Sequence, residues 1–315
     1  MRHIFVINPP AGKGRHLEAT RSLILTAAEK LGVPVECYVT QSKGDGARFA
    51  RETAASAADG EPVRLYACGG DGTLNELVNG VYGFDRVELG CVPVGSGNDF
   101  VKSFSEPEAF RDIARQLSGR AEAINVVRCN DLFAINLANI GFDSDVCRRM
   151  ESYKNLPLVS GKGAYNLALV VTMFQKLGKK LRVRFPGEEP TEDIRVLSAI
   201  GNGICYGGGY YATPKASLTD DLLDVALVNR LNLFQILPRV GAYKAGRHLE
   251  DPRFEKHLTF RRVPSLRIES DEPMELCIDG EICPVGNAVD FSVAEKRLDF
   301  VLPEGVTMVN GKCQN

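Results

Sequence analysis

Residues 69–80 read GGDGTLNELVNG and follow a short apolar run, Val63–Cys68. The three glycines permit a tight turn with positive φ angles and let another backbone approach closely. After the turn, apolar residues recur at i, i+3, i+4 and i+7, which predicts a helix over Thr73–Gly83 with Thr73 as its N-cap. The stretch therefore indicates a β-strand, a glycine turn and a helix in succession.

The same alternation extends over the first 120 residues or so. A second helical stripe covers Glu106–Gly119, and further strand-like runs are His3–Asn8, Pro34–Gln41 and Val87–Val94. Strand–helix–strand repetition predicts a three-layer α/β domain, a parallel sheet with helices on its faces. Ligands of such sheets bind at the carboxyl ends of the strands. That rule selects three loops: Asn8–Arg15, Gly69–Thr73 and Gly95–Asp99.

The second half of the chain has a strand-like alternation instead, interrupted by helical stretches at Ala164–Leu177 and Leu233–Ala245. We expect strands at Val126–Cys129, Leu132–Asn136, Leu181–Phe185, Val196–Ile200, Val225–Val228, Leu266–Ile268, Leu276–Ile278 and Val289–Val293. The prediction is an α/β nucleotide-binding domain over residues 1–124 and a mainly β, sandwich-like domain over residues 125–297. The tail, residues 298–315, contains the apolar run Leu298–Leu302 and is a candidate to return to the first domain.

Composition narrows the class of protein. The chain has 315 residues, 44% of them apolar and 25% charged, which suits about two globular domains. A net charge of −2 excludes a general basic field, so non-specific nucleic-acid binding is not expected. The nine cysteines form no C-x-x-C pair and the N-terminus lacks a signal-peptide pattern, so we expect a cytoplasmic protein with reduced thiols. The longest apolar run, Leu167–Val171, is far too short to span a membrane, so membrane contact would be peripheral.

The glycine turn has the chemistry of a phosphate cradle. Backbone N–H groups at a helix N-terminus favour an anion, and Asp71 adds a carboxylate where phosphate-bound magnesium needs an oxygen ligand. The alternative is a plain βα turn with an aspartate cap. Familiar fingerprints do not fit: Lys13 has no G-x-x-x-x-G-K-[ST] context, and Gly95–Phe100 lacks the third glycine of G-x-G-x-x-G. The protein-kinase motifs H-R-D and D-F-G do not follow either.

Several motifs in order resemble the catalytic domain of diacylglycerol kinases. In the first half these are Asn8–Gly14, Gly69–Gly80 and Pro93–Phe100. In the second half they are Gly201–Gly203, Gly207–Gly209, Pro214–Ala216, Asp220–Val225 and Asp279–Glu281. The chain is most similar to the soluble bacterial lipid kinases, whose fold is related to NAD kinase and 6-phosphofructokinase. The continuation Asn75-Glu76-x-x-Asn79-Gly80 favours the lipid kinases over the NAD kinases.

The resemblance implies an ATP site in the first domain. Its residues would be Asn8, Gly12, Thr40, Gly69, Gly70, Asp71, Gly72, Thr73, Asn75, Glu76, Ser96 and Asn98. Ser96 stands where the family usually has threonine, a change that keeps the hydroxyl. The resemblance further implies that Asp71 and Asp99 position the catalytic Mg²⁺, directly or through water.

A second, structural Mg²⁺ site is implied at Ser217, Asp220 and the carbonyl of Leu222. Residues 220 and 221 read Asp-Asp where Asp-Gly is commoner in the family, which puts the local backbone geometry in doubt. Without the resemblance, this stretch is an acidic turn before a strand.

Asp279-Gly280-Glu281 stands between two β-like runs. By residue type it is a type I′ hairpin turn. The resemblance makes it the catalytic loop, in which one carboxylate accepts the proton of the attacking hydroxyl. The sequence does not separate Asp279 from Glu281 as that base.

These observations together lead us to expect an ATP- and Mg²⁺-dependent lipid kinase, with diacylglycerol as the leading acceptor and phosphatidic acid as the product. Alternatives are another lipid acceptor (a sphingoid base, monoacylglycerol or a prenol), a soluble acceptor such as NAD, and a nucleotide-binding regulator without catalysis. Peripheral contact with a membrane is expected through basic clusters; a solvated charged face is the alternative. The clusters are Lys176, Lys179, Lys180, Arg182 and Arg184, and Arg239, Lys244, Arg247 and His248. The sequence leaves open whether the chain is a monomer or a homodimer.

Overall fold

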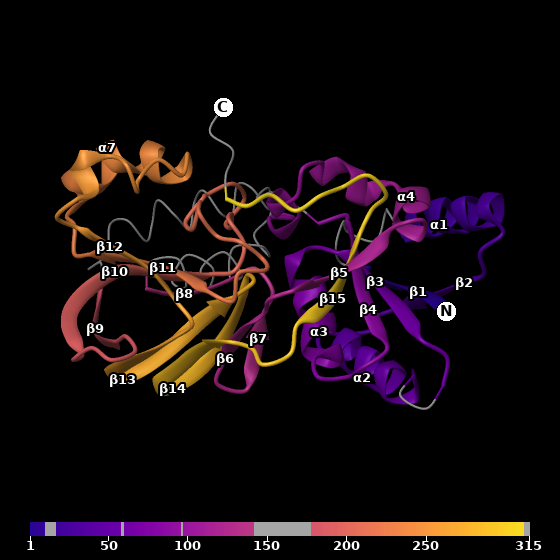
Figure 1. Ribbon diagram of the computed structural model, residues 1–315, viewed down its shortest axis with the longest axis horizontal. Coiled ribbons are helices and arrows are strands. Elements are labelled where there is room, and N and C mark those ends of the chain that lie inside the picture. Colours follow the sequence, from indigo (N-terminus) through magenta and orange to yellow (C-terminus); the bar gives the residue numbers. More distant parts are fainter. Residues whose placement is uncertain (10–16, 58–59, 96, 142–177, 312–315) are drawn as a thin grey trace, which may run out of the picture. The chain divides into compact units, whose positions relative to one another are not determined.

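The computed structural model describes residues 1–9, 17–57, 60–95, 97–141 and 178–311. The chain forms two compact units (Figure 1). Unit 1 contains residues 1–126 and 295–309, and unit 2 contains residues 127–294 and 310–315. Gly12, Ser96 and the expected helix Ala164–Leu177 lie outside the described residues.

Unit 1 is built on a sheet with the strand order β2-β1-β3-β4-β15-β5. The strands from β2 to β15 are parallel, and β5 is antiparallel to β15. Their bounds are β1 Arg2–Ile7, β2 Val35–Val39, β3 Val63–Gly69, β4 Val87–Pro93, β5 Arg120–Ile124 and β15 Leu298–Leu302. The four strands predicted in this region are confirmed, and the tail strand joins this sheet. The edge strand β5 was not predicted, because it is short and alternates charged residues with alanines.

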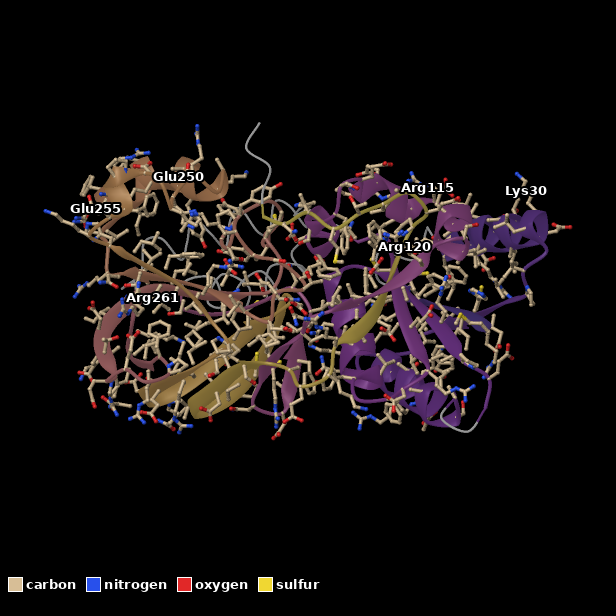
Figure 2. The ribbon with its side chains drawn as sticks, viewed as in Figure 1. Lys30, Arg115, Arg120, Glu250, Glu255 and Arg261 are labelled. Atoms are coloured by element: carbon tan, nitrogen blue, oxygen red, sulfur yellow. The ribbon has the colours of Figure 1, made fainter. Side chains whose placement is uncertain are left out.

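Helices cover both faces of this sheet (Figure 1). The helix α1 (Leu17–Leu31) packs with α4 (Ile113–Leu117) on one face, and α2 (Asp45–Ala57) packs with α3 (Asp71–Val81) on the other. Arg115 of α4 donates hydrogen bonds to the carbonyl of Glu304, 2.8 Å from Nε and 2.6 Å from Nη2 (Figure 2). That contact ties α4 to the segment that follows β15.

The prediction of one helix over Glu106–Gly119 is wrong. A 3₁₀ helix covers Pro107–Arg111, and α4 begins again at Ile113. The carboxylate of Asp112 accepts the N–H groups of Ala114 and Arg115, at 3.0 and 3.1 Å. Asp112 therefore acts as an N-cap and divides the periodic stretch into two elements.

The prediction that Thr73 caps the helix is wrong. The helix begins two residues earlier, at Asp71, and its N-cap is Gly70 with no side-chain cap hydrogen bond. The Thr73 hydroxyl is used elsewhere, because its Oγ1 accepts a hydrogen bond from Nδ2 of Asn8 at 2.9 Å.

Unit 2 is mainly antiparallel β-structure, with the strand order β12-β11-β10-β8-β13-β14-β6-β7 and β9 paired to both β10 and β13. The bounds are β6 Val127–Cys129, β7 Leu132–Ala134, β8 Leu137–Gly141, β9 Lys179–Arg184, β10 Thr191–Gly201, β11 Leu223–Asn229, β12 Leu258–Val263, β13 Ser265–Ile278 and β14 Glu281–Val293. The two predicted strands Leu266–Ile268 and Leu276–Ile278 are one strand, β13, whose register against β14 shifts between Glu269 and Met274. Pro273, which has no N–H to donate, lies in this irregular part.

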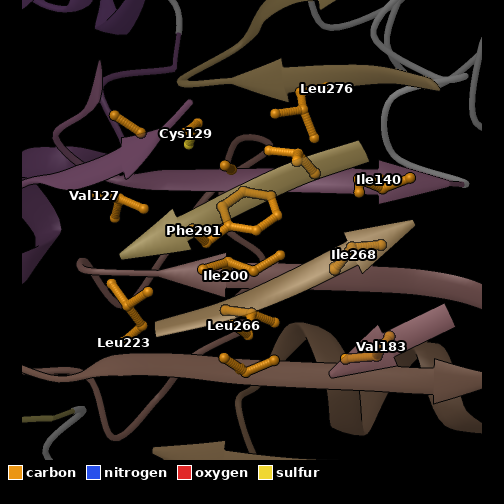
Figure 3. Packing of buried hydrophobic residues seen from close by; sticks show 14 of the residues in the cluster. Val127, Cys129, Ile140, Val183, Ile200, Leu223, Leu266, Ile268, Leu276 and Phe291 are labelled. Carbon is orange, nitrogen blue, oxygen red and sulfur yellow. The ribbon is translucent and has the colours of Figure 1, made fainter. Parts of the chain in front are cut away.

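The core of unit 2 consists of apolar side chains from strands that are far apart in sequence (Figure 3). Ile140 of β8, Ile200 of β10, Ile268 of β13 and Phe291 of β14 are each at most 1% exposed. The helix α7 (Leu233–Lys244) begins with a capping box between Asn232 and Gln235. Among the described residues, no helix is both long and apolar enough to cross a membrane.

Candidate functional site

The turn after β3 is a place where two backbones come unusually close. A Cβ atom on Gly69 would lie 2.2 Å from Oγ1 of Thr73, and one on Gly95 would lie 2.5 Å from Cα of Gly70. The Gly69 carbonyl accepts the N–H groups of Val94 and Gly95, at 2.9 and 3.1 Å. Gly69, Gly70 and Gly72 do not have positive φ angles. Close approach therefore explains Gly69 and Gly95, whereas the left-handed backbone that we also expected at this turn does not occur.

Asp71, the first residue of α3, holds the loop that follows β4. Its Oδ1 accepts the N–H of Asp99 at 2.9 Å and that of Phe100 at 3.3 Å, and its Oδ2 lies 3.1 Å from the Asp99 nitrogen. This carboxylate is thus a positioning group for the Gly95–Asp99 loop, whatever else it binds. Burial raises the pKa of the Cys91 thiol nearby, and the charge on Asp71 raises it further.

Asp99 and Asn98 complete this loop. Asp99 is 4% exposed, and its Oδ1 lies 2.5 Å from Nζ of Lys102. Asn98 adopts a φ of 52° and donates from Nδ2 to the Gly95 carbonyl at 2.8 Å. The buried Oδ1 of Asn98 has no hydrogen-bond partner within the described part of the chain. A buried polar atom without a partner is uncommon and suggests a ligand or water at that position.

Other predicted ATP-site residues gather at the same edge of the sheet. Asn8, directly after β1, contacts Thr73 as described, and its N–H donates to the Cys68 carbonyl at 3.0 Å. Thr40, directly after β2, is buried and donates its N–H to the Ile7 carbonyl at 3.0 Å. The carboxyl ends of β1, β2, β3 and β4 therefore present these residues together, as parallel topology requires.

Two predicted residues have other contacts. Glu76 accepts the Gly44 N–H at 3.0 Å through Oε1, which places its carboxylate at the beginning of α2. Asn75 is buried. Nδ2 of Asn79 donates hydrogen bonds to the backbone carbonyl of Asn75 at 2.9 Å and to its Oδ1 at 3.2 Å. These contacts join α3 to α2 and stabilise α3 itself, so the family motif also has a packing role here.

The donor set at this edge suits a divalent cation and a phosphate. Oδ2 of Asp71 and Oδ2 of Asp99 would lie 3.1 and 3.8 Å from a Cβ on Gly97, so the two carboxylates face one small space. Carboxylate oxygens are the ligands that Mg²⁺ prefers, and the N-terminus of α3 favours a bound phosphate. The residues of unit 1 therefore fit both groups.

In unit 2, Asp279 occupies a cradle of backbone N–H groups. Its Oδ2 accepts the N–H of Ile135 at 2.8 Å, and its Oδ1 accepts those of Asn136 and Leu137 at 3.0 and 2.9 Å. Asp279 is 6% exposed, and backbone donors hold both of its carboxylate oxygens. The negative charge is felt by buried Cys129, whose thiol pKa is raised by burial first and by Asp279 second.

The hairpin geometry explains how Asp279 reaches that cradle. Asp279 and Gly280 have φ angles of 47° and 92° and form the two-residue connection between β13 and β14, as a type I′ turn requires. Glu281 is the first residue of β14, pairs with Ile278 and is partly exposed. The structural and the catalytic interpretations of this loop are therefore compatible.

Sequence reasoning did not identify Asn136 as part of this cluster. Its carbonyl accepts the N–H groups of Asn202 and Gly203, both at 2.9 Å, and its Nδ2 donates to the Cys205 carbonyl at 2.8 Å. Asp279 thus orders the turn before β8, which in turn orders the Gly201–Gly203 motif. The signal was one asparagine between Ile135 and Leu137, which a strand pattern alone does not explain.

The second metal site, on Ser217, Asp220 and Leu222, stays a prediction. Oγ of Ser217 donates to Oδ1 of Asn310 at 3.2 Å, and Oδ1 of Asp220 accepts the Leu222 N–H at 3.1 Å. Oδ2 of Asp220 forms an ion pair with Arg262. The guanidinium already balances this carboxylate, and no group of three acidic, histidine or cysteine side chains suited to a metal occurs in the described ranges.

Two cavities lie away from the predicted site residues. One of about 370 Å³ is lined by Lys215, His248, Phe254 and their neighbours, and one of about 190 Å³ lies between the Val81–Val87 turn and residues 296–299. The candidate sites are identified by their hydrogen-bond geometry instead.

Each half of the chain matches a known family model. Residues 2–129 match the model of the diacylglycerol kinase catalytic domain, and residues 136–301 match that of the YegS C-terminal NAD kinase beta sandwich-like domain. A protein of Chromohalobacter salexigens named "Probable lipid kinase YegS-like" is 31% identical over 86% of this chain and 85% of its own length. The diacylglycerol kinase of Bacillus subtilis is 27% identical over 88% of each chain. A crystal structure of a diacylglycerol kinase from Bacillus anthracis superposes with a TM-score of 0.68 and 20% identity, covering 97% of this chain and 98% of that one, which shows a shared fold.

Proposed function

The chain belongs to the family of YegS-like lipid kinases with a diacylglycerol kinase catalytic domain, and from that membership we propose that it phosphorylates diacylglycerol with ATP, giving phosphatidic acid. The observation that carries the proposal is the contact of Asp71 with the backbone N–H groups of Asp99 and Phe100. This contact joins the two glycine-containing loops at the edge of the sheet where such folds bind ligands.

Unit 1 would bind the triphosphate. The N-terminus of α3 provides N–H groups and a favourable dipole for the phosphates. Asp71 and Asp99 would hold Mg²⁺, which neutralises charge on the phosphates when bound. The Asp71 contact fixes the spacing of the two carboxylates before any ligand arrives, so little reorganisation is needed.

Glu281 is the better candidate for the base that accepts the proton of the attacking hydroxyl. Both oxygens of Asp279 already accept backbone N–H groups, and the side chain is buried, so this carboxylate is committed to holding the hairpin. Glu281 follows two residues later and is partly exposed, so a substrate hydroxyl can reach it. We assign Glu281 as the base and Asp279 as the positioning residue that fixes the hairpin.

In the reaction, the acceptor oxygen forms a bond to the γ-phosphorus as the bond to the bridging oxygen of ADP breaks. The hydroxyl proton passes to Glu281, and ADP leaves with the electron pair of the broken bond. The products are ADP and a phosphomonoester of the lipid.

The test is transfer of label from γ-labelled ATP in the presence of Mg²⁺. Diacylglycerol, monoacylglycerol, a sphingoid base, a prenol and NAD are offered separately. We expect label in an organic-phase product that migrates with phosphatidic acid, and the fastest rate with diacylglycerol. Label confined to water-soluble products, or transferred fastest to NAD, would reject the proposal.

A further inference from the structure

The helix α7 exposes an apolar face. Phe234 and Leu237 are 85% and 56% exposed, and Pro238 and Gly241 are exposed beside them. Positions 234, 237, 238, 241 and 244 follow a spacing of three and four residues, so they share one side of the helix. Ordinarily that side of a helix in a globular protein is polar.

The opposite side of α7 is the one that packs inward. Ile236 and Tyr243 contact a cluster formed by Leu197, Val228 and Leu231. The orientation of the helix is therefore fixed by packing on the sheet. Phe234 and Leu237 face outward because the inner positions are already occupied by other apolar side chains.

The surroundings of α7 are basic although the whole chain has a net charge of −2. Residues 230–256 contain six lysines and arginines against three acidic residues. Lys244, on the same side as Phe234, and Arg247 are exposed. Nζ of Lys244 lies 5.4 Å from the centre of the Tyr210 ring, and no ion pair of either residue occurs within the described part of the chain. The acidic Glu250 and Glu255 belong to the segment after the helix (Figure 2).

The other basic cluster differs, because acidic neighbours pair with two of its residues on β9, while its Lys176 lies outside the described residues. Lys180 pairs with Glu192 at 2.8 Å, and Arg182 pairs with Asp271 at 2.9 Å. The exposed leucines of α1, Leu23 and Leu25, provide a second contrast. That helix carries two acidic and two basic residues, so it has apolar exposure without an excess of positive charge.

We propose that the outer face of α7 docks on an anionic lipid bilayer, with Phe234 and Leu237 entering the boundary between headgroups and acyl chains and Lys244 and Arg247 contacting anionic headgroups. Aromatic and aliphatic side chains on one side of a helix, with basic residues beside them, suit an interfacial membrane helix. The proposal rests on the proposed function in that the acceptor is a lipid, and it names the surface by which the enzyme reaches that lipid.

The absence of tryptophan from the sequence allows a site-specific reporter. We would compare Phe234→Trp with Leu23→Trp, each a single fluorophore on an exposed helix. On adding vesicles of phosphatidylglycerol and phosphatidylcholine in equal amounts, Phe234→Trp is expected to shift its emission to the blue and to be quenched by lipids brominated on the acyl chain. Leu23→Trp is expected to do neither.

Sedimentation with the same vesicles measures the affinity, without ATP, so it does not depend on catalysis. The double variant Phe234→Ser/Leu237→Ser should lower the partition coefficient by about tenfold or more, as expected for loss of apolar area from the bilayer boundary. Lys244→Glu/Arg247→Glu should also weaken binding, and added salt should weaken wild-type binding. The control Leu23→Ser/Leu25→Ser should bind like the wild type.

Three results would overturn the docking proposal: no wild-type binding to anionic vesicles, equal binding by Phe234→Ser/Leu237→Ser, or a change in oligomeric state of that variant with vesicle binding unaltered. The last result would assign the face to a second copy of the chain. Vesicle binding through α7 with no transfer of phosphate to any lipid would reject the proposed function and leave the docking surface intact. Activity on diacylglycerol, with vesicle binding unaffected by the α7 variants, would reject the docking surface and leave the proposed function intact.

Discussion

At the scale of single residues, two carboxylates in one hairpin have different environments. Asp279 is buried and held by three backbone N–H groups, whereas Glu281 lies partly exposed at the start of β14. The motif shows that both residues are acidic and does not show which of them is held by the backbone N–H groups of Ile135–Leu137. That distinction depends on Ile135–Leu137, a segment more than 140 positions away in the chain, so it could not be predicted from the motif.

Exchanging each carboxylate for its amide separates the two roles. Asp279→Asn replaces an acceptor oxygen by a donor that faces backbone N–H groups, so it should destabilise unit 2 by about 1–3 kcal/mol. Glu281→Gln should leave the free energy of unfolding within about 0.5 kcal/mol of wild type and lower kcat by about 100-fold or more. Urea denaturation and initial rates on diacylglycerol measure both quantities. A stable, inactive Asp279→Asn protein with an active Glu281→Gln protein would reverse the assignment.

His248 is a second residue whose role depends on its surroundings and not on its residue type alone. It was grouped with the basic cluster near α7, but it is 1% exposed and burial lowers its pKa to about 4. Its Nε2 lies 3.1 Å from the Ala212 carbonyl, and its ring packs against Tyr243 and Phe254. It is therefore neutral near pH 7 and adds nothing to the positive surface.

The depressed pKa of His248 predicts a pH dependence of stability. The unfolded histidine binds a proton below a pKa of about 6.5, whereas the folded one does so only near 4. The stabilisation is complete above pH 6.5 and is lost as the pH falls toward 4, by about 3 kcal/mol. His248→Gln should reduce this loss, as measured by urea denaturation of the wild type and the variant across that range. Identical slopes for wild type and His248→Gln would contradict the prediction.

At the scale of elements, local pattern predicted most strands, the position of β15 and the start of α7 at Leu233, but not where α3 and α4 begin or which strands pair. Asp112 starts α4 by accepting the Ala114 N–H, and the Thr73 hydroxyl contacts Asn8 while α3 begins after Gly70. The strands β5, β8 and β12 were not predicted, because short or charged runs become strands only beside a partner. Long-range pairing, which a single sequence does not show, decides these cases.

The strand β15 lies near the end of the chain but belongs to the core of unit 1. It pairs with β4 and β5, and Phe300 is fully buried against Phe100, Phe104 and Phe110. Phe300→Ala should lower the free energy of unfolding of unit 1 by about 3–5 kcal/mol because it leaves a cavity.

The control for Phe300→Ala is Asp299→Ala on the same strand, whose side chain is exposed and which should change stability by less than about 1 kcal/mol. Calorimetry with the wild type alongside would show the difference. Equal effects of the two substitutions would mean that β15 does not contribute to the core.

At the scale of the whole molecule, the family motifs predicted both units and the residues on which each candidate site is built. Asp71 and Asp279 were both singled out from sequence, and each anchors a loop through backbone N–H groups. The motifs did not predict these contacts, because almost every residue has a backbone N–H group and the sequence does not show which of them donates. Each unit thus fixes the position of its own acidic group before a ligand binds. Groups that are already positioned need little rearrangement during phosphoryl transfer.

The most direct test of phosphoryl transfer at the Asp71 turn is the rate of labelled phosphate transfer from ATP to diacylglycerol by Asp71→Asn and Asp112→Asn. Both aspartates accept two backbone N–H groups in unit 1, but Asp112 only caps α4. We expect kcat/KM to fall by about 100-fold or more for Asp71→Asn and to change by less than about twofold for Asp112→Asn, whose asparagine can still cap. A folded Asp71→Asn protein that transfers phosphate at the wild-type rate would contradict the account.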